Sequence, residues 1–112
     1  MTGTTARTQT FVFTDIEGST RLLRALGDEY PSVLRAHDRI VVDAAEAEGG
    51  EAFGSEGDAQ NLVFDDALAA VRAAAAAQRS LAAHEWPEGG RVRVRMGVHT
   101  GEARRDEVGF TG

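Results

Sequence analysis

The pattern of hydrophobic and polar residues predicts strands and helices in a definite order. An apolar run rich in β-formers predicts a buried strand over residues 10–14, and regular alternation predicts a half-buried strand over residues 91–99. Two short apolar stretches, residues 51–54 and 62–64, predict a β-hairpin around the turn 55–58, with Gly57 as its hinge. The polar, Thr-rich residues 1–9 predict a disordered tail, which leaves one domain over residues 10–112.

Helical spacing accounts for the segments between these strands. A short helix is predicted over residues 19–26, capped by Ser19 or Thr20, with Gly27 ending it. A second helix is predicted from its cap, Asp28, to the Gly-Gly pair 49–50, with a proline in its first turn. A third begins after one of two consecutive aspartates, residues 65–66, and reaches about residue 84.

Apolar residues at helical intervals predict which face of each long helix is buried. In the second helix these residues are Val33, Leu34, His37, Ile40, Val41 and Ala44, and in the third they are Leu68, Val71, Ala75, Gln78, Leu81 and Ala82. A histidine on such a stripe is more often a core residue than a ligand. In the last strand, Val92, Val94, Met96 and Val98 are expected to face the core, and Arg91, Arg93 and Arg95 to line a solvated face, with a phosphate or partner surface as the less favoured interpretation.

The predicted order β-α-β-β-α-β is that of the ferredoxin-like α+β fold, an antiparallel sheet with helices on one face. In this topology the third strand lies between the first two and runs antiparallel to both. The turn before it therefore lies beside the C-terminal end of the first strand. Asp15 is at that end and Asp58 is in that turn, so the two carboxylates are expected to converge at one corner of the sheet. His99 is expected at the opposite end.

Composition excludes several classes of protein. The net charge of -6 argues against nucleic acid as a partner and against a polymerase-like palm, which would need a basic groove. With no cysteine, the chain has no disulfide framework and no Cys-based zinc site. The N-terminal residues lack the apolar core of a signal peptide, and Arg72 interrupts the Ala-rich stretch 67–77, so we expect a cytoplasmic protein without a membrane span.

The stretch from residue 11 to residue 20 combines a strand, a carboxylate, a glycine turn and a helix N-terminus. Asp15 and Asp58 can hold a divalent cation through hard oxygen ligands, and the free N–H groups of a helix start suit a polyphosphate. Such a pair suits metal-assisted phosphoryl or nucleotidyl chemistry. The alternative is that Asp15 is a turn former and Asp58 an ordinary hairpin residue, since aspartate is common in both places.

These motifs carry a resemblance to a known family. The run Phe-Val-Phe-Thr-Asp-Ile-Glu-Gly-Ser-Thr at residues 11–20, Gly-Gly at 49–50, Gly-Asp at 57–58 and Gly-Val-His-Thr-Gly-Glu at 97–102 together resemble the class III adenylate/guanylate cyclase catalytic domain. The resemblance covers residue 10 to the end. It implies ATP or GTP as substrate, two Mg²⁺ or Mn²⁺ ions, and a head-to-tail homodimer, or association with another cyclase-type chain, that shares its active sites.

The resemblance also implies roles for individual residues. The metal ligands would be the carboxylates of Asp15 and Asp58 and the carbonyl of Ile16. The substrate-binding residues would be Ile16, Glu17, Gly18, Ser19, Thr20 and Gly57, with the triphosphate against the backbone of residues 16–20.

The chain departs from the family's pattern at the positions that read the purine. Gly54 stands four residues before Asp58, where the family has a lysine, and the chain contains no lysine. If the final Gly-Phe-Thr-Gly matches the family's Asp-Tyr-x-Gly, Gly109 occupies the second such position. The Asn and Arg that act on the transition state are expected just after Gly112, so the chain resembles the front part of the domain.

Two hypotheses follow. The chain is either part of an enzyme that makes cyclic AMP and pyrophosphate from ATP in intracellular signalling, or a degenerate homologue that binds metal or nucleotide, or only dimerises, as a regulatory module. By itself it is expected to be inactive. An uncovered apolar sheet face is expected to favour self-association.

Overall fold

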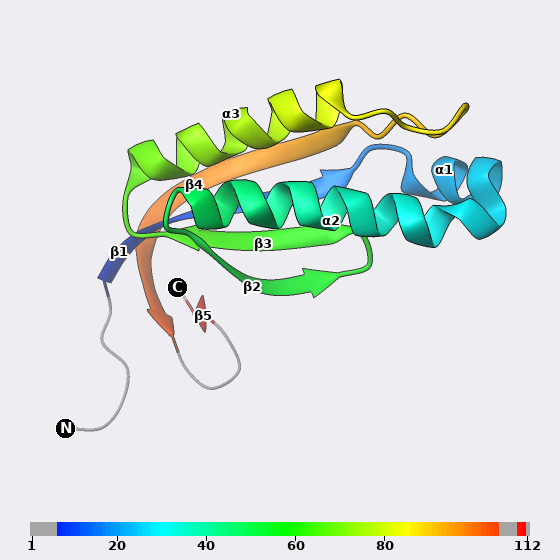
Figure 1. Ribbon diagram of the computed structural model, residues 1–112. Coiled ribbons are helices and arrows are strands. Elements are labelled where there is room, and N and C mark those ends of the chain that lie inside the picture. Colours follow the sequence, from blue (N-terminus) through cyan, green and yellow to red (C-terminus); the bar gives the residue numbers. More distant parts are fainter. Residues whose placement is uncertain (1–6, 106–109, 112) are drawn as a thin grey trace.

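The computed structural model describes residues 7–105 and 110–111, with side chains through residue 103. The sheet within that part has the strand order β2-β3-β1-β4-β5 (Figure 1). The strands are β1 (Arg7–Ile16), β2 (Glu51–Glu56), β3 (Ala59–Phe64), β4 (Val94–Arg105) and β5 (Phe110–Thr111), and the helices are α1 (Ser19–Leu26), the 3₁₀-helix η1 (Gly27–Glu29), α2 (Tyr30–Ala47) and α3 (Ala67–Ala83).

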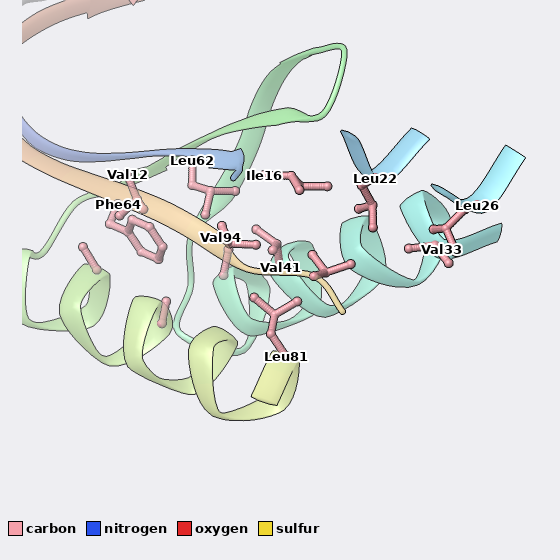
Figure 2. Close-up of a cluster of buried hydrophobic side chains, with 14 residues drawn as sticks. Val12, Ile16, Leu22, Leu26, Val33, Val41, Leu62, Phe64, Leu81 and Val94 are labelled. Carbon is pink, nitrogen blue, oxygen red and sulfur yellow. The ribbon is translucent and has the colours of Figure 1, made fainter. Parts of the chain in front are cut away.

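The predicted topology is confirmed. Strand β3 lies between β2 and β1 and pairs antiparallel with both, and β4 pairs antiparallel with the other edge of β1. The apolar β1 is therefore the central strand of the core sheet. Figure 2 shows α2 and α3 packed on the same face of this sheet, which makes the fold the expected α+β arrangement. No helix within the described residues is long and apolar enough to span a membrane.

The first and last strands of the core prediction were expected at the right place in the sheet but with the wrong bounds. Strands β1 and β4 pair continuously from Arg7 opposite Ala103 to Ile16 opposite Val94. Residues 7–9, expected in a disordered tail, therefore belong to β1, and residues 100–105, beyond the predicted end of the last strand, belong to β4. Residues 91–93 precede the strand instead of opening it. Because each long strand satisfies the backbone of the other, pairing extends past the point where hydrophobic alternation stops. Residues 1–6 of the predicted tail lie outside the described residues.

The short helix α1 has the predicted bounds but a different cap. Gly18, with φ of 65°, occupies the N-cap position, and no side chain caps the helix, so neither Ser19 nor Thr20 has that role. Gly27, with φ of 56°, ends the helix as predicted. The 3₁₀-helix η1 then includes Asp28, so α2 begins at Tyr30 and Asp28 is not its cap. Positive φ explains both glycines, since other residues rarely adopt it.

The core lies between the sheet and the two long helices. Its buried members from α2 include Val33, His37 and Val41, as predicted, and the last buried residue is Ala45 in place of the expected Ala44. Figure 2 shows strand side chains meeting helix side chains in this layer. The labelled members are Val12, Ile16, Leu22, Leu26, Val33, Val41, Leu62, Phe64, Leu81 and Val94.

The predicted inner face of α3 was wrong except at Leu81, which is buried as expected. The buried residues are Ala70, Ala73, Ala77 and Leu81. Leu68 and Val71, expected to be buried, are 54% and 53% exposed. Small side chains let the helix approach the sheet closely, so the alanine stripe faces inward and the larger residues face out. Of the two candidate caps, Asp66 caps the helix by accepting hydrogen bonds from the N–H groups of residues 68 and 69.

The face of the sheet opposite the long helices carries an aromatic cluster. The ring of Phe11 lies 6.2 Å from that of Phe13 and 5.8 Å from that of Phe53, the latter edge to face. Phe13 is 46% exposed. Since side chains alternate along a strand, Asp15 lies on this same face of β1. The helix-free face therefore holds both the aromatic cluster and the first predicted site residue.

Candidate functional site

Asp15 is the next-to-last residue of β1 and lies directly opposite Arg95 of β4. The two side chains form a bidentate ion pair: Nε of Arg95 donates to Oδ1 at 3.0 Å and a terminal nitrogen donates to Oδ2 at 2.8 Å. The Asp15 side chain is 46% exposed and that of Arg95 is 64% exposed. Asp15 thus has an accessible carboxylate, already paired with a positive charge.

Asp58 lies in the turn between β2 and β3, which is tighter than predicted and consists of residues 57–58. Gly57 has φ of 62°, so its predicted role as a hinge is confirmed. The Oδ2 atom of Asp58 accepts a hydrogen bond from the backbone N–H of Ile16 at 2.7 Å. This bond brings the Asp58 carboxylate to the residue next to Asp15, which confirms the expected convergence at one corner of the sheet.

Electrostatics at the corner centre on Arg95. The hydrogen bond to Asp15 is the main cause that raises the pKa of Arg95 above its ordinary value, and the charges of Asp15, Glu17 and Asp58 raise it further. Burial raises the pKa of Tyr30, at the start of α2, and the negative charge of Asp58 raises it too. The corner is therefore acidic around the Arg95 guanidinium.

The segment from residue 16 to residue 20 connects this corner to α1. The Ile16 side chain is buried, which anchors the end of β1 in the core. The N–H of Ile16 is used by Asp58, and that of Glu17 donates to the carbonyl of Arg93 at 2.8 Å. The first turn of α1 starts at Ser19 without a side-chain cap. Of the backbone expected to receive a triphosphate, the first two N–H groups are thus engaged within the protein.

Two hollows lie at this corner, one lined by Asp15 and the other by Glu17 and Gly18. An open groove of about 410 Å³ on the helix-free face is lined by Asp15, Arg95, Asn61 and other strand residues. A larger cavity of about 640 Å³ lies between α1 and the segment that follows α3, and it is lined by Glu17, Gly18, Arg21, Leu22, Ala25, Ala82, His84, Trp86, Pro87, Gly89, Arg91 and Arg93. Both hollows adjoin the predicted site segment from different sides. Throughout the described residues, no three His, Cys, Asp or Glu side chains gather closely enough to hold a metal by themselves.

Arg95 is the site residue that sequence reasoning missed. The alternation over residues 91–99 predicted a solvated arginine row, and Arg91 and Arg93 are indeed exposed. The antiparallel register of β1 and β4 identifies Arg95 as a site residue, because it places Arg95 opposite Asp15. His99 pairs across from Phe11, remote from the corner as predicted.

Gly54 and Gly109 stand where the resembled family has its purine-reading residues, and the structure describes only the first of them. Gly54 lies in β2, and a Cβ there would meet only the Asn61 side chain, at 3.5 Å. The position could therefore accept a larger residue. Gly109 and Gly112 lie outside the described residues.

No protein-family model matches the chain. The chain is 33% identical over 96 residues to the serine/threonine-protein kinase pkn2 of Myxococcus xanthus, a match that covers 83% of the chain and 12% of the kinase. Among solved structures, an adenylate cyclase of Trypanosoma brucei, described in its monomeric state, is 27% identical with a TM-score of 0.82. An adenylate/guanylate cyclase/hydrolase from Silicibacter pomeroyi is 23% identical with a TM-score of 0.81.

Each match covers nearly all of this chain but only about two thirds of the solved structure. The match to the trypanosomal cyclase takes in 93% of this chain and 61% of that one, and the bacterial match takes in 98% and 66%. The fold and the site motifs define a nucleotide cyclase domain. The chain is a partial class III adenylate/guanylate cyclase catalytic domain, as its motifs implied.

Proposed function

We propose that this chain forms part of a nucleotidyl cyclase site that converts ATP, or GTP, to the cyclic nucleotide and pyrophosphate with two Mg²⁺ or Mn²⁺ ions. The observation that carries the proposal is the hydrogen bond from Ile16 to Asp58, which holds a second carboxylate beside Asp15. We extend the proposal to intracellular signalling in the cytoplasm, the setting expected from the sequence.

The residues at the corner fit a hard divalent cation. Asp15 and Asp58 offer carboxylate oxygens and Ile16 offers a carbonyl, and Mg²⁺ is commonly held by one or two carboxylates plus water and substrate phosphates. The guanidinium on Asp15 acts as a stand-in cation and marks where positive charge is favoured. When bound, the metal would neutralise phosphate charge and lower the pKa of an attacking hydroxyl.

The chain's own residues would hold the metals and bind the triphosphate. Asp15 and Asp58 would hold the metals, and the Ile16–Asp58 bond would keep their spacing constant. The first turn of α1, uncapped by any side chain, would offer backbone donors and a favourable dipole to the triphosphate. Gly57 supports this arrangement by permitting the tight turn that presents Asp58.

We further propose that the chain works beside a second copy or another cyclase-type chain. The exposed ring of Phe13, which stacks on the buried ring of Phe11, gives an apolar surface on the same face as Asp15, and such a surface favours association. Sedimentation velocity is expected to show a larger species at high concentration, and Phe13→Ser to reduce it. A monomer for both proteins at every concentration would contradict this part of the proposal.

The metal site is tested by Mn²⁺ titration followed by electron paramagnetic resonance of the free ion. Asp15→Asn is expected to bind Mn²⁺ at least about tenfold more weakly, since even outer-shell changes at metal sites cost that much. Asp58→Asn should also weaken binding while its amide oxygen still accepts from Ile16. The matched control is Asp43→Asn, which removes the same charge from an exposed position on α2. Equal binding by Asp15→Asn and Asp43→Asn would remove the site.

A further inference from the structure

We propose that Arg95 is an internal cation that competes with divalent metal for Asp15. In the metal-free protein its guanidinium holds the carboxylate, and a metal ion must displace it to bind. The inference rests on the proposed metal site at Asp15 and Asp58 and adds a means by which the protein sets its own metal affinity.

The geometry of the ion pair is the first support. Arg95 donates from two nitrogens to the two different oxygens of Asp15, at 3.0 and 2.8 Å. A fork of this kind points two N–H groups at the carboxylate at once. A metal ion would need at least one of these oxygens, and the guanidinium already occupies a lone pair on each, so the two cations compete for the carboxylate.

The strand register is the second support. Asp15 and Arg95 are directly opposed residues of β1 and β4, so the backbone ladder brings their side chains together on the helix-free face. The ladder continues through Ile16 and Val94, and Glu17 adds a further backbone bond to Arg93. Since these backbone bonds hold the strand ends together, the ion pair can open without separating the strands.

The surrounding charge is the third support. Arg95 lies in the field of Asp15, Glu17 and Asp58. A guanidinium among three carboxylates neutralises repulsion that an empty acidic corner would suffer. A divalent ion at the same place would do so more completely, which gives the exchange of cations a driving force.

Exposure decides whether this competition blocks the metal or only weakens its binding. Both side chains are substantially exposed, at 64% for Arg95 and 46% for Asp15. Exposed ion pairs shift an equilibrium by only about two- to fivefold. Arg95 is therefore expected to tune metal affinity by that factor and to exchange readily.

The test compares Mn²⁺ dissociation constants of the full chain and three variants. Arg95→Gln is expected to bind Mn²⁺ about two- to fivefold more tightly than the unaltered chain. Arg93→Gln is the matched control, because it removes the same charge from an exposed arginine for which the described residues show no side-chain ion pair. Arg95→Lys keeps the charge but loses the fork, and its affinity should fall between those of the chain and Arg95→Gln.

A second measurement follows the displacement itself. The Nε–H resonance of Arg95 in nitrogen-15 NMR spectra should shift on addition of diamagnetic Mg²⁺, and the shift should vanish in Asp15→Asn. An Arg95 resonance that does not move at saturating Mg²⁺ would overturn the displacement.

The outcomes separate this inference from the proposal beneath it. If Arg95→Gln binds Mn²⁺ no more tightly than Arg93→Gln while Asp15→Asn still loses binding, the competition is wrong and the metal site stands. If neither the chain nor Arg95→Gln shows Mn²⁺ binding that depends on Asp15, both proposals fall.

Discussion

Replacement of Gly50 by alanine is expected to destabilise the fold although its backbone tolerates the change. Gly50 joins α2 to β2, and its φ is not positive, so alanine meets no backbone strain there. A Cβ at this position would lie 2.3, 2.7 and 2.8 Å from three carbons of the Phe64 ring. Phe64 is only 2% exposed and belongs to the core, so its ring has little room to move.

The magnitude follows from overpacking. Forcing an extra carbon into a packed core typically costs about 1–3 kcal/mol, because side chains leave their preferred rotamers or the backbone shifts. For a domain of this size, about 1 kcal/mol lowers Tm by about 4–8 °C. Gly50→Ala is thus expected to lower Tm by about 4–24 °C. The cost falls on the stability of the fold, since Gly50 is remote from the Asp15 corner in sequence and position.

Thermal and urea unfolding, followed by circular dichroism, measure the effect. Gly54→Ala is the matched control, because its Cβ would meet only one side-chain atom, at 3.5 Å, and its change should stay within about 0.5 kcal/mol. Phe64→Leu removes the ring atoms that clash, so the double variant should be more stable than the sum of the single changes predicts, by at least about 0.5 kcal/mol. A Gly50→Ala protein as stable as Gly54→Ala would contradict the predicted clash with Phe64.

Two further predictions concern the start of α3. Asp66→Ala should lower the free energy of unfolding by about 0.5–2 kcal/mol, because it removes the cap on the N–H groups of residues 68 and 69. Urea unfolding measures this change, and a loss no larger than that of Asp65→Ala would contradict the prediction. The pKa of Asp65 is lowered, first by the hydrogen bond from Arg7 and then by that from Gln9, so its stabilising contribution is present above the ordinary value of 3.8 and is lost as pH falls through the lower folded value. Asp65 is 72% exposed, so its effect on stability is small. Below pH 3.8, the urea midpoint should depend less steeply on pH in Asp65→Asn than in the unaltered chain. Parallel curves for the two proteins would contradict this prediction.

Much of the candidate site was predictable from local sequence. Asp15 at the end of an apolar run and Asp58 after Gly57 were identified from spacing and turn chemistry, and topology alone predicted their convergence. The bond between Ile16 and Asp58 agrees with that deduction. Arg95 could not be assigned in this way, because its role depends on the register between strands distant in sequence.

The helices show the same division between local and tertiary control. The stripe of α2 was predictable because large apolar residues recur at helical spacing, and Val33, His37 and Val41 are buried as expected. For α3 the same rule failed, because hydrophobic size was taken to mean burial. The close approach of α3 to the sheet favours alanines, and it leaves Leu68 and Val71 exposed.

The order of the elements, the topology and the identity of the two converging carboxylates could all be predicted from the sequence, because strand propensity, glycine turns and helical spacing act over a few residues. The extent of β1 and β4, the buried face of α3 and the cation that lies on Asp15 became known from the folded chain. Those features depend on backbone pairing and packing between segments far apart in the chain, and a local pattern carries no information on the distance or register between such segments.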